Sequence, residues 1–188
     1  PGQLTLADLR AAYQAPVQLR LDPAAHEAIE ASVACVNQII AEGRTAYGIN
    51  TGFGLLASTR IANADLEKLQ RSLVRSHAAG SGPPVEREVV RALMLLRLST
   101  LAPGHTGVRR QTAETYAAML SHGITPVVPE HGSLGCSGDL APLAHCALAL
   151  MGDGEVATAD GDVVHAADAL KAAGIEPVVL QEKEGLAL

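Results

Sequence analysis

The chain has 188 residues, of which 48 % are hydrophobic and 18 % are charged, and its formal net charge is -6. This length is enough for one full core, or for one domain and part of a second, and the composition excludes a disordered or collagen-like chain. The negative charge argues against nucleic acid as a partner.

The residue types favour packed helices and an intracellular location. Aromatic residues make up only 2 %, and the apolar content comes mostly from Ala, Leu and Val, which suits helices better than a β-sandwich. Three cysteines, Cys35, Cys136 and Cys146, lack metal-type spacing and are expected to be reduced thiols. The longest apolar run, residues 143–151, is too short to cross a bilayer, and no signal segment precedes it. We therefore expect a mainly α, soluble, cytoplasmic protein with no metal site and no membrane partner.

The first part of the chain predicts two helices and a loop. Thr5 to Asp8 has the acidic variant of the capping box and opens a short helix that should end near Tyr13. Asp22-Pro23 supplies an N-cap and a proline at the first helical position, and the helix that follows should stop at Gly43. Residues 47–54 contain glycines at 48, 52 and 54 and no helical period, which predicts a loop with unusual backbone angles.

Three helices, expected to be antiparallel neighbours, are predicted between residues 63 and 122. Asn63 should cap the first, and residues 80–84 should end it and start the second, which stops near Pro103. Thr106 should cap the third, and Gly123 should end it. The apolar spacing predicts two faces: Leu66, Leu69, Leu73 and His77 on the first helix, and Val85, Val89, Leu93 and Leu96 on the second.

Glycines and prolines punctuate the last third of the chain. Residues 125–139 predict a loop that leads into an apolar helix with Pro142 in its first turn, ending at Gly152. Asp160-Gly161 favours a two-residue turn and predicts one small β-hairpin, followed by a short helix over residues 166–173. Residues 181–188 look like the opening of another helix. A Pro-Gly break divides the chain into two expected domains, 1–103 and 104–188.

The segment from Gly132 to Asp139 is the most unusual one, because a serine stands before a glycine in a loop that leads into a helix. A hydrolase nucleophile elbow requires glycine two places after the serine, and that position is Asp139, so this hypothesis fails on spacing. An anion-binding loop is permitted, but neither the Walker pattern nor the dinucleotide fingerprint is matched. On local features alone, a glycine-rich turn with Asp139 as helix N-cap explains the segment equally well.

Three segments carry a resemblance to a known family. Residues 135–145 read GCSGDLAPLAH, which closely resembles the signature of the aromatic amino-acid ammonia-lyases and aminomutases that build a methylidene-imidazolone (MIO) group. Residues 47–54, YGINTGFG, resemble the tyrosine loop of that family, and residues 76–80, SHAAG, resemble its histidine-specific members. The resemblance runs from about residue 4 to residue 188. It implies the N-terminal part of that family's fold, with a helical domain that carries the tyrosine loop and the start of the central helical domain with the triplet.

The resemblance implies that MIO forms autocatalytically from Cys136-Ser137-Gly138, without a metal. The glycine nitrogen attacks the carbonyl before the serine, two waters are lost, and the serine side chain becomes the methylidene. Gly138 has no Cβ, so its nitrogen can come close. The family usually has alanine where this chain has Cys136, a position that gives the ring only backbone atoms.

The same resemblance implies roles for four further residues. Tyr47 serves as the base that removes a β-proton, although as a lone loop aromatic it would be taken for a surface residue. Asp139 helps the ring to form and holds the loop, and Gly54 shapes the tyrosine loop. His77 contacts the substrate imidazole, whereas its spacing alone favours a core histidine.

Relatives in this family are longer than this chain and form homotetramers whose sites draw residues from three subunits. The resemblance therefore implies deamination of L-histidine to urocanate and ammonia by the full-length protein, and an inactive chain when these residues stand alone. A tyrosine or phenylalanine ammonia-lyase or aminomutase, or a non-catalytic fragment, remains an alternative.

Overall fold

Local capping sets the start of the first helix in the computed structural model, which describes residues 2–136 and 138–188. The amide of Asp8 donates to the Thr5 hydroxyl at 3.2 Å, and the amide of Thr5 donates to the Asp8 carboxylate at 2.9 Å. This reciprocal pair is the predicted capping box, and helix α1 (Leu6–Gln14) begins directly after it. The Asp22 carboxylate likewise caps a short 3-10 turn, Pro23–Ala25, that leads into α2 (His26–Ala41).

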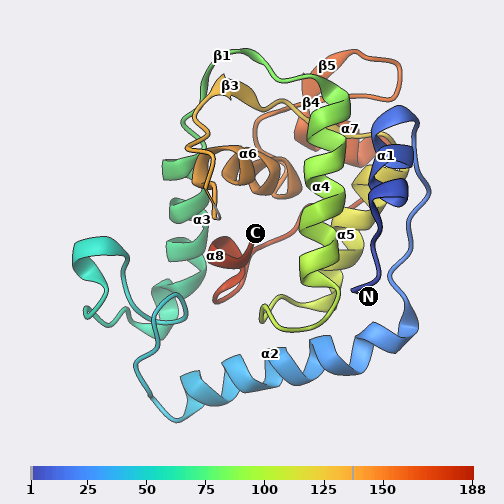
Figure 1. The fold of residues 1–188 in the computed structure, drawn as a ribbon. Helices are drawn as coiled ribbons and strands as arrows, with labels where there is room; N and C mark the ends of the chain where they lie inside the picture. The colour runs from blue at the N-terminus through green and yellow to red at the C-terminus, as the bar shows by residue number, and fades with distance from the viewer. Residues whose placement is uncertain (1, 137) are drawn as a thin grey trace.

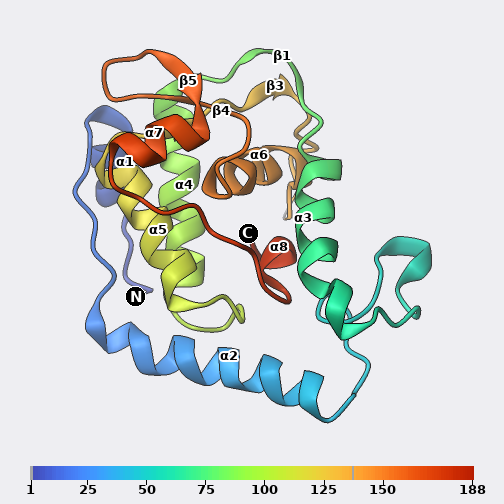
Figure 2. The same cartoon turned by 180° about the vertical axis from the view of Figure 1, so that it is seen from behind.

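Further α-helices follow along the chain, as expected for a mainly α protein. They are α3 (Leu66–His77), α4 (Arg87–Leu101), α5 (Arg110–Ser121), α6 (Leu140–Leu150), α7 (Ala166–Ala172) and α8 (Glu184–Ala187). Figure 1 shows α4, α5 and α6 grouped centrally, with α2 running across one end, and Figure 2 shows the same layers from behind. No helix among the described residues is both long and apolar enough to cross a membrane.

Two small antiparallel sheets complete the fold. Strands β2 (Thr125–Pro126), β4 (Glu155–Ala157) and β5 (Val163–His165) form one, and its β4–β5 pair is the predicted hairpin. The predicted two-residue turn is wrong, because the Thr158 amide donates to the Asp162 carbonyl at 2.9 Å and the chain reverses over residues 159–161. Strands β1 (Ser81–Pro84) and β3 (Pro129–His131) form the other sheet, where the sequence predicted only loops.

The buried face of α4 differs from the predicted one. Its fully buried residues include Val90, Met94 and Leu101, whereas Val89 and Leu96 are 43 % and 45 % exposed. The helix is apolar almost all round, so spacing alone could not select a face, and packing against α1 and α5 selects it. Leu93 and Leu96 are left on the side that faces α6.

The predicted caps of α3 and α5 are also wrong. Asn63 begins a 3-10 turn, and α3 starts only at Leu66. Thr106 lies in a loop, and α5 starts at Arg110, because the buried Glu184 carboxylate accepts the Arg109 amide at 2.9 Å. A cap from 75 residues away cannot be read from the local sequence.

The predicted antiparallel neighbours α3 and α4 are separated in space. In both views α6 lies between them, and α3 packs on α6 and α8 while α4 packs on α1 and α5. One hydrophobic core contains residues from both halves of the chain, including Ile29, Met94, Tyr116 and Leu150. The division at residues 103–104 stays a prediction.

Candidate active site

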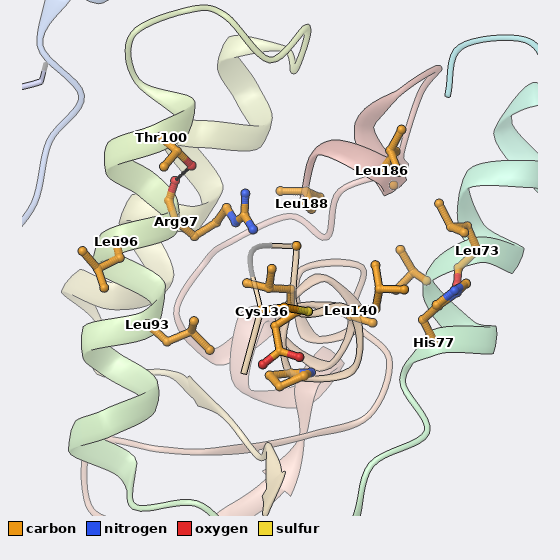
Figure 3. Close-up of a pocket in the computed structure, with 17 residues that line it drawn as sticks. Leu73, His77, Leu93, Leu96, Arg97, Thr100, Cys136, Leu140, Leu186 and Leu188 are labelled. Atoms are coloured by element: carbon orange, nitrogen blue, oxygen red, sulfur yellow. Dashed lines mark hydrogen bonds between the residues drawn. The ribbon is translucent and has the colours of Figure 1, made fainter. Parts of the chain in front are cut away.

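A cavity of about 520 Å³ lies between α3, α4 and α6 and is bordered by the C-terminal segment, residues 185–188. Figure 3 shows Leu93 and Arg97 on α4 directed toward Leu73 and His77 on α3 across this space, with Cys136 between them. The wall is mostly aliphatic. Among the described residues, its titratable or hydroxyl side chains are His77, Arg97, Thr100, Cys136 and Asp139.

His77 lies at the cavity wall with one ring nitrogen already engaged. Its Nδ1 is 2.8 Å from the Leu73 carbonyl oxygen and 3.0 Å from the Ser76 hydroxyl. A carbonyl can only accept, so Nδ1 carries the proton and Nε2 keeps its lone pair in the neutral ring. The helix is thus turned relative to the sequence prediction, because Gln70 and Val74 are buried while Leu73 and His77 line the cavity.

The predicted triplet reaches the same cavity through two of its residues. Cys136 and Gly138 line the wall, and Ser137 lies outside the described residues. Gly138 has a φ of +71°, in the left-handed region that favours glycine, and no described residue other than its chain neighbours has an atom within 4 Å of the place a Cβ would occupy. The backbone at Gly138 is therefore strongly turned and has free space beside it.

Asp139 closes the loop that precedes α6. Its carboxylate accepts the Ser133 hydroxyl and, at 2.8 Å, the amide of Leu134. The Ser133 hydroxyl first, then the Leu134 amide, hold the pKa of this carboxyl below its ordinary value. Asp139 occupies the N-cap position of α6, but its side chain makes no cap hydrogen bond. Its carboxylate therefore stabilises the loop at Ser133 and Leu134 and not the end of the helix.

The tyrosine loop lies beside the cavity without lining it. Tyr47 is 57 % exposed, and its ring meets Phe53 edge to face with centroids 5.7 Å apart. Asn50 is fully buried; its side chain accepts the Ala46 amide at 2.9 Å and donates to the Arg44 carbonyl at 2.7 Å. These bonds fix the loop from inside, so Tyr47 is presented on an ordered turn.

One contact joins the tyrosine loop to the cavity. A Cβ on Gly48 would lie 2.2 Å from Cδ2 of Leu186, a residue of the cavity wall. Gly54, the other loop glycine singled out in the sequence, has a φ of +58° and begins a 3-10 turn away from that wall. The structure thus brings His77, Cys136, Gly138 and Asp139 together, and places Tyr47 outside the cavity wall, next to the glycine that approaches Leu186.

Sequence reasoning missed Arg97, which stands on the opposite wall. Its Nη1 donates to the Ala187 carbonyl at 3.5 Å, and its buried Nε has no hydrogen-bond partner among the described residues. A cation within the apolar run of α4 was the available signal, because such a residue seldom faces a core without a partner.

The C-terminal segment is held in the cavity wall by a buried carboxylate. Glu184 is 0 % exposed and accepts the Arg109 guanidinium at 2.8 Å, the Thr112 hydroxyl at 2.6 Å and the Gln181 amide at 2.8 Å. Next to it, the Gly185 amide donates to the Gln70 side chain at 2.9 Å. These bonds anchor Leu186 and Leu188 between α3 and α5.

Known proteins resemble this chain over nearly its whole length. The sequence model of one family, described as Aromatic amino acid lyase, matches residues 4–188. The chain is similar to histidine ammonia-lyase of Pseudomonas fluorescens (strain SBW25), with 58 % identity over 188 residues that cover 100 % of this chain and 36 % of that relative.

Solved structures show the same similarity in three dimensions. Histidine ammonia-lyase from Trypanosoma cruzi superposes with a TM-score of 0.89 at 38 % identity, over 98 % of this chain and 35 % of that one. Tyrosine aminomutase from Streptomyces globisporus gives a TM-score of 0.90 at 38 % identity, over 98 % and 34 %. The chain thus spans little more than a third of the length of these relatives.

Proposed function

This chain belongs to the aromatic amino acid lyase family, and from that premise we propose that it supplies one part of the active site of an enzyme that converts L-histidine into urocanate and ammonia. The observation that carries the proposal is the shared cavity, where a histidine whose Nε2 has no hydrogen-bond partner among the described residues faces the residues around the predicted triplet. The 58 % identity to a histidine ammonia-lyase supports histidine as the substrate.

The proposal includes an MIO group formed from Cys136, Ser137 and Gly138. The turned backbone at Gly138 and the free space beside it fit a compact ring at this point of the loop. The exposed Cys136 side chain fits as well, since that position contributes only backbone atoms to the ring. When present, the group supplies an electrophile that turns the substrate amine into a leaving group.

The chain's own residues take four roles in this proposal. His77 Nε2 binds the substrate imidazole, and the aliphatic wall excludes water around it. Tyr47 Oη accepts the β-proton from the loop beside the cavity. Asp139 holds the loop closed, and the N-terminus of α6 directs its positive dipole end at the triplet.

The proposal extends to the complete protein as a cytoplasmic homotetramer. Beside the tyrosine loop, Leu55 is 103 % exposed and Leu56 is 57 % exposed, although both are large apolar residues. Such a patch is typical of a protein interface, and a second subunit that covers it would lie next to Tyr47. The division of the chain at residues 103–104 is part of the same proposal.

Steady-state assays of the complete polypeptide that contains this chain test the proposal. L-Histidine should give urocanate, seen by its ultraviolet absorbance, while L-tyrosine and L-phenylalanine should give little cinnamate-type product. A preference for L-tyrosine or L-phenylalanine, or formation of a β-amino acid, would instead assign the site to another member of the family. The separate 188-residue chain should release no urocanate, because it spans about a third of the length of its relatives.

A further inference from the structure

One face of α6 carries a histidine that bonds to the segment behind His77. Ala141 and His145 lie one helical turn apart on this face. The Gly80 amide donates to Nε2 of His145 at 3.1 Å, across 65 residues of sequence. An amide can only donate, so Nε2 is the accepting nitrogen and the neutral ring carries its proton on Nδ1.

The packing around this bond leaves little room for movement. A Cβ on Gly80 would lie 3.1 Å from His145 Nε2 and 3.1 Å from Cβ of Pro129. A Cβ on Gly132 would lie 3.0 Å from Cβ of Ala141 and 3.2 Å from Cα of Gly80. The segment after α3, the loop before α6 and α6 itself therefore meet at van der Waals distance.

The chain between Gly80 and His77 is short and tightly turned. The Ala79 amide donates to the His77 carbonyl at 2.8 Å, and the Ala78 amide donates to the Val74 carbonyl at 2.9 Å. A displacement of Gly80 should therefore also displace His77. At the other end of the link, α6 begins directly after Asp139, so His145 connects the two halves of the candidate site.

We propose that His145 is a positioning residue: its bond to the Gly80 amide sets the distance between His77 and the loop of Cys136 to Asp139, and thereby sets the affinity for substrate. This inference rests on the proposed function. Burial lowers the pKa of His145, which keeps the ring in the neutral form that can accept. His145 does not touch substrate and acts through His77.

Three variants of the complete polypeptide test this role. His145→Gln places an amide oxygen near the position of Nε2 and so keeps a hydrogen-bond acceptor there. His145→Leu removes the acceptor. His145→Asn keeps an amide oxygen, but its side chain is one methylene shorter than that of glutamine, so the oxygen lies too far from the Gly80 amide. His122→Gln is the matched control, because His122 is the exposed C-cap residue of α5 and, among the described residues, its ring bonds only to the Ala118 carbonyl of that helix.

The loss of one hydrogen bond should raise the KM for L-histidine by about 5- to 10-fold in His145→Leu and His145→Asn, with kcat changed by less than about 2-fold. His145→Gln should return KM to within about 2- to 3-fold of wild type. The control should match wild type, and the mass loss of two waters should be complete in every variant. If His145→Leu does not fold, the Gln and Asn pair makes the same comparison.

Two results would overturn the positioning role of His145. One is an unchanged KM in both His145→Leu and His145→Asn. The other is a fall in kcat with incomplete loss of water, which would show that His145 only supports the fold. If wild type has no lyase activity, the proposed function fails separately. In that case the NMR chemical shifts of the His77 ring nitrogens test the link between His145 and His77. These shifts should differ from wild type in His145→Leu and should match wild type in His145→Gln. Identical His77 spectra in both variants would refute the link.

Discussion

Replacing Glu184 with glutamine tests how the C-terminal wall of the cavity is held. The substitution keeps the shape of the side chain but removes its charge, and it turns an amide NH2 toward groups that donate to the carboxylate. Arg109, Thr112 and Gln181 all donate to this carboxylate, which is 0 % exposed. The Arg109 guanidinium would then lose its counter-charge in a partly buried place.

The size of the effect follows from the burial of the pair. Removing one partner of a buried ion pair costs about 3–5 kcal/mol. Because the Arg109 side chain is 31 % exposed, we expect the lower end, about 3 kcal/mol in the free energy of unfolding. With an m-value of about 2 kcal/mol/M, the urea midpoint should fall by about 1.5 M.

Urea unfolding followed by circular dichroism measures this change on the 188-residue chain. Glu114→Gln is the control, since the Arg110–Glu114 pair is 3.5 Å apart with side chains 46 % and 48 % exposed, and its loss should cost less than about 0.5 kcal/mol. A Glu184→Gln midpoint equal to that of the control would refute the anchoring role of Glu184.

Three further predictions concern single side chains. Desolvation raises the pKa of the buried Cys146 thiol to about 12, so iodoacetamide at pH 8 should label the exposed Cys35 and Cys136 and leave Cys146 unmodified until the chain is unfolded; rapid labelling of Cys146 in the folded chain would contradict this. His77→Leu should raise the KM for L-histidine by about 10-fold or more, because the imidazole loses its hydrogen-bond partner, and steady-state kinetics of the complete polypeptide should show no change if His77 is only a packing residue. The hydrogen bonds from Ser133 and Leu134 lower the folded-state pKa of Asp139, so their contribution to stability is fully present above the ordinary carboxyl pKa of 3.8 and is lost as the pH falls through the lower folded-state pKa. The NMR shift of the Leu134 amide should therefore titrate only below pH 3.8, and an Asp139→Asn chain should show no such titration.

Local signals in the sequence predicted those elements whose boundaries depend on neighbouring residues. The capping box at Thr5 and the Asp22-Pro23 start of the second helix bond within their own turns, so the sequence located them. The mainly helical fold, the hairpin and the family resemblance are confirmed.

Long-range contacts decided what the sequence missed. The start of α5 depends on Glu184, the face of α4 on packing against α1 and α5, and the pairing of β1 with β3 on two segments that contain prolines. No local pattern encodes those choices. The same limit applies to the site, where Arg97 and Leu186 reach the cavity through tertiary packing alone.

The motifs predicted the site better than the spacing did. Family resemblance selected His77 and residues 136–139, and among the described ones His77, Cys136, Gly138 and Asp139 share one cavity. Spacing alone had placed His77 in a core. Tyr47 stands outside the cavity wall, so its role as the base stays a proposal.

The mass of the peptide that spans residues 132–145, taken from the complete polypeptide, tests the central claim most directly. If Cys136, Ser137 and Gly138 form the electrophile, the wild-type peptide should be lighter by two waters, and the Ser137→Ala peptide should have its full mass and no lyase activity. A wild-type peptide of full mass in a protein that still converts L-histidine to urocanate would contradict the account.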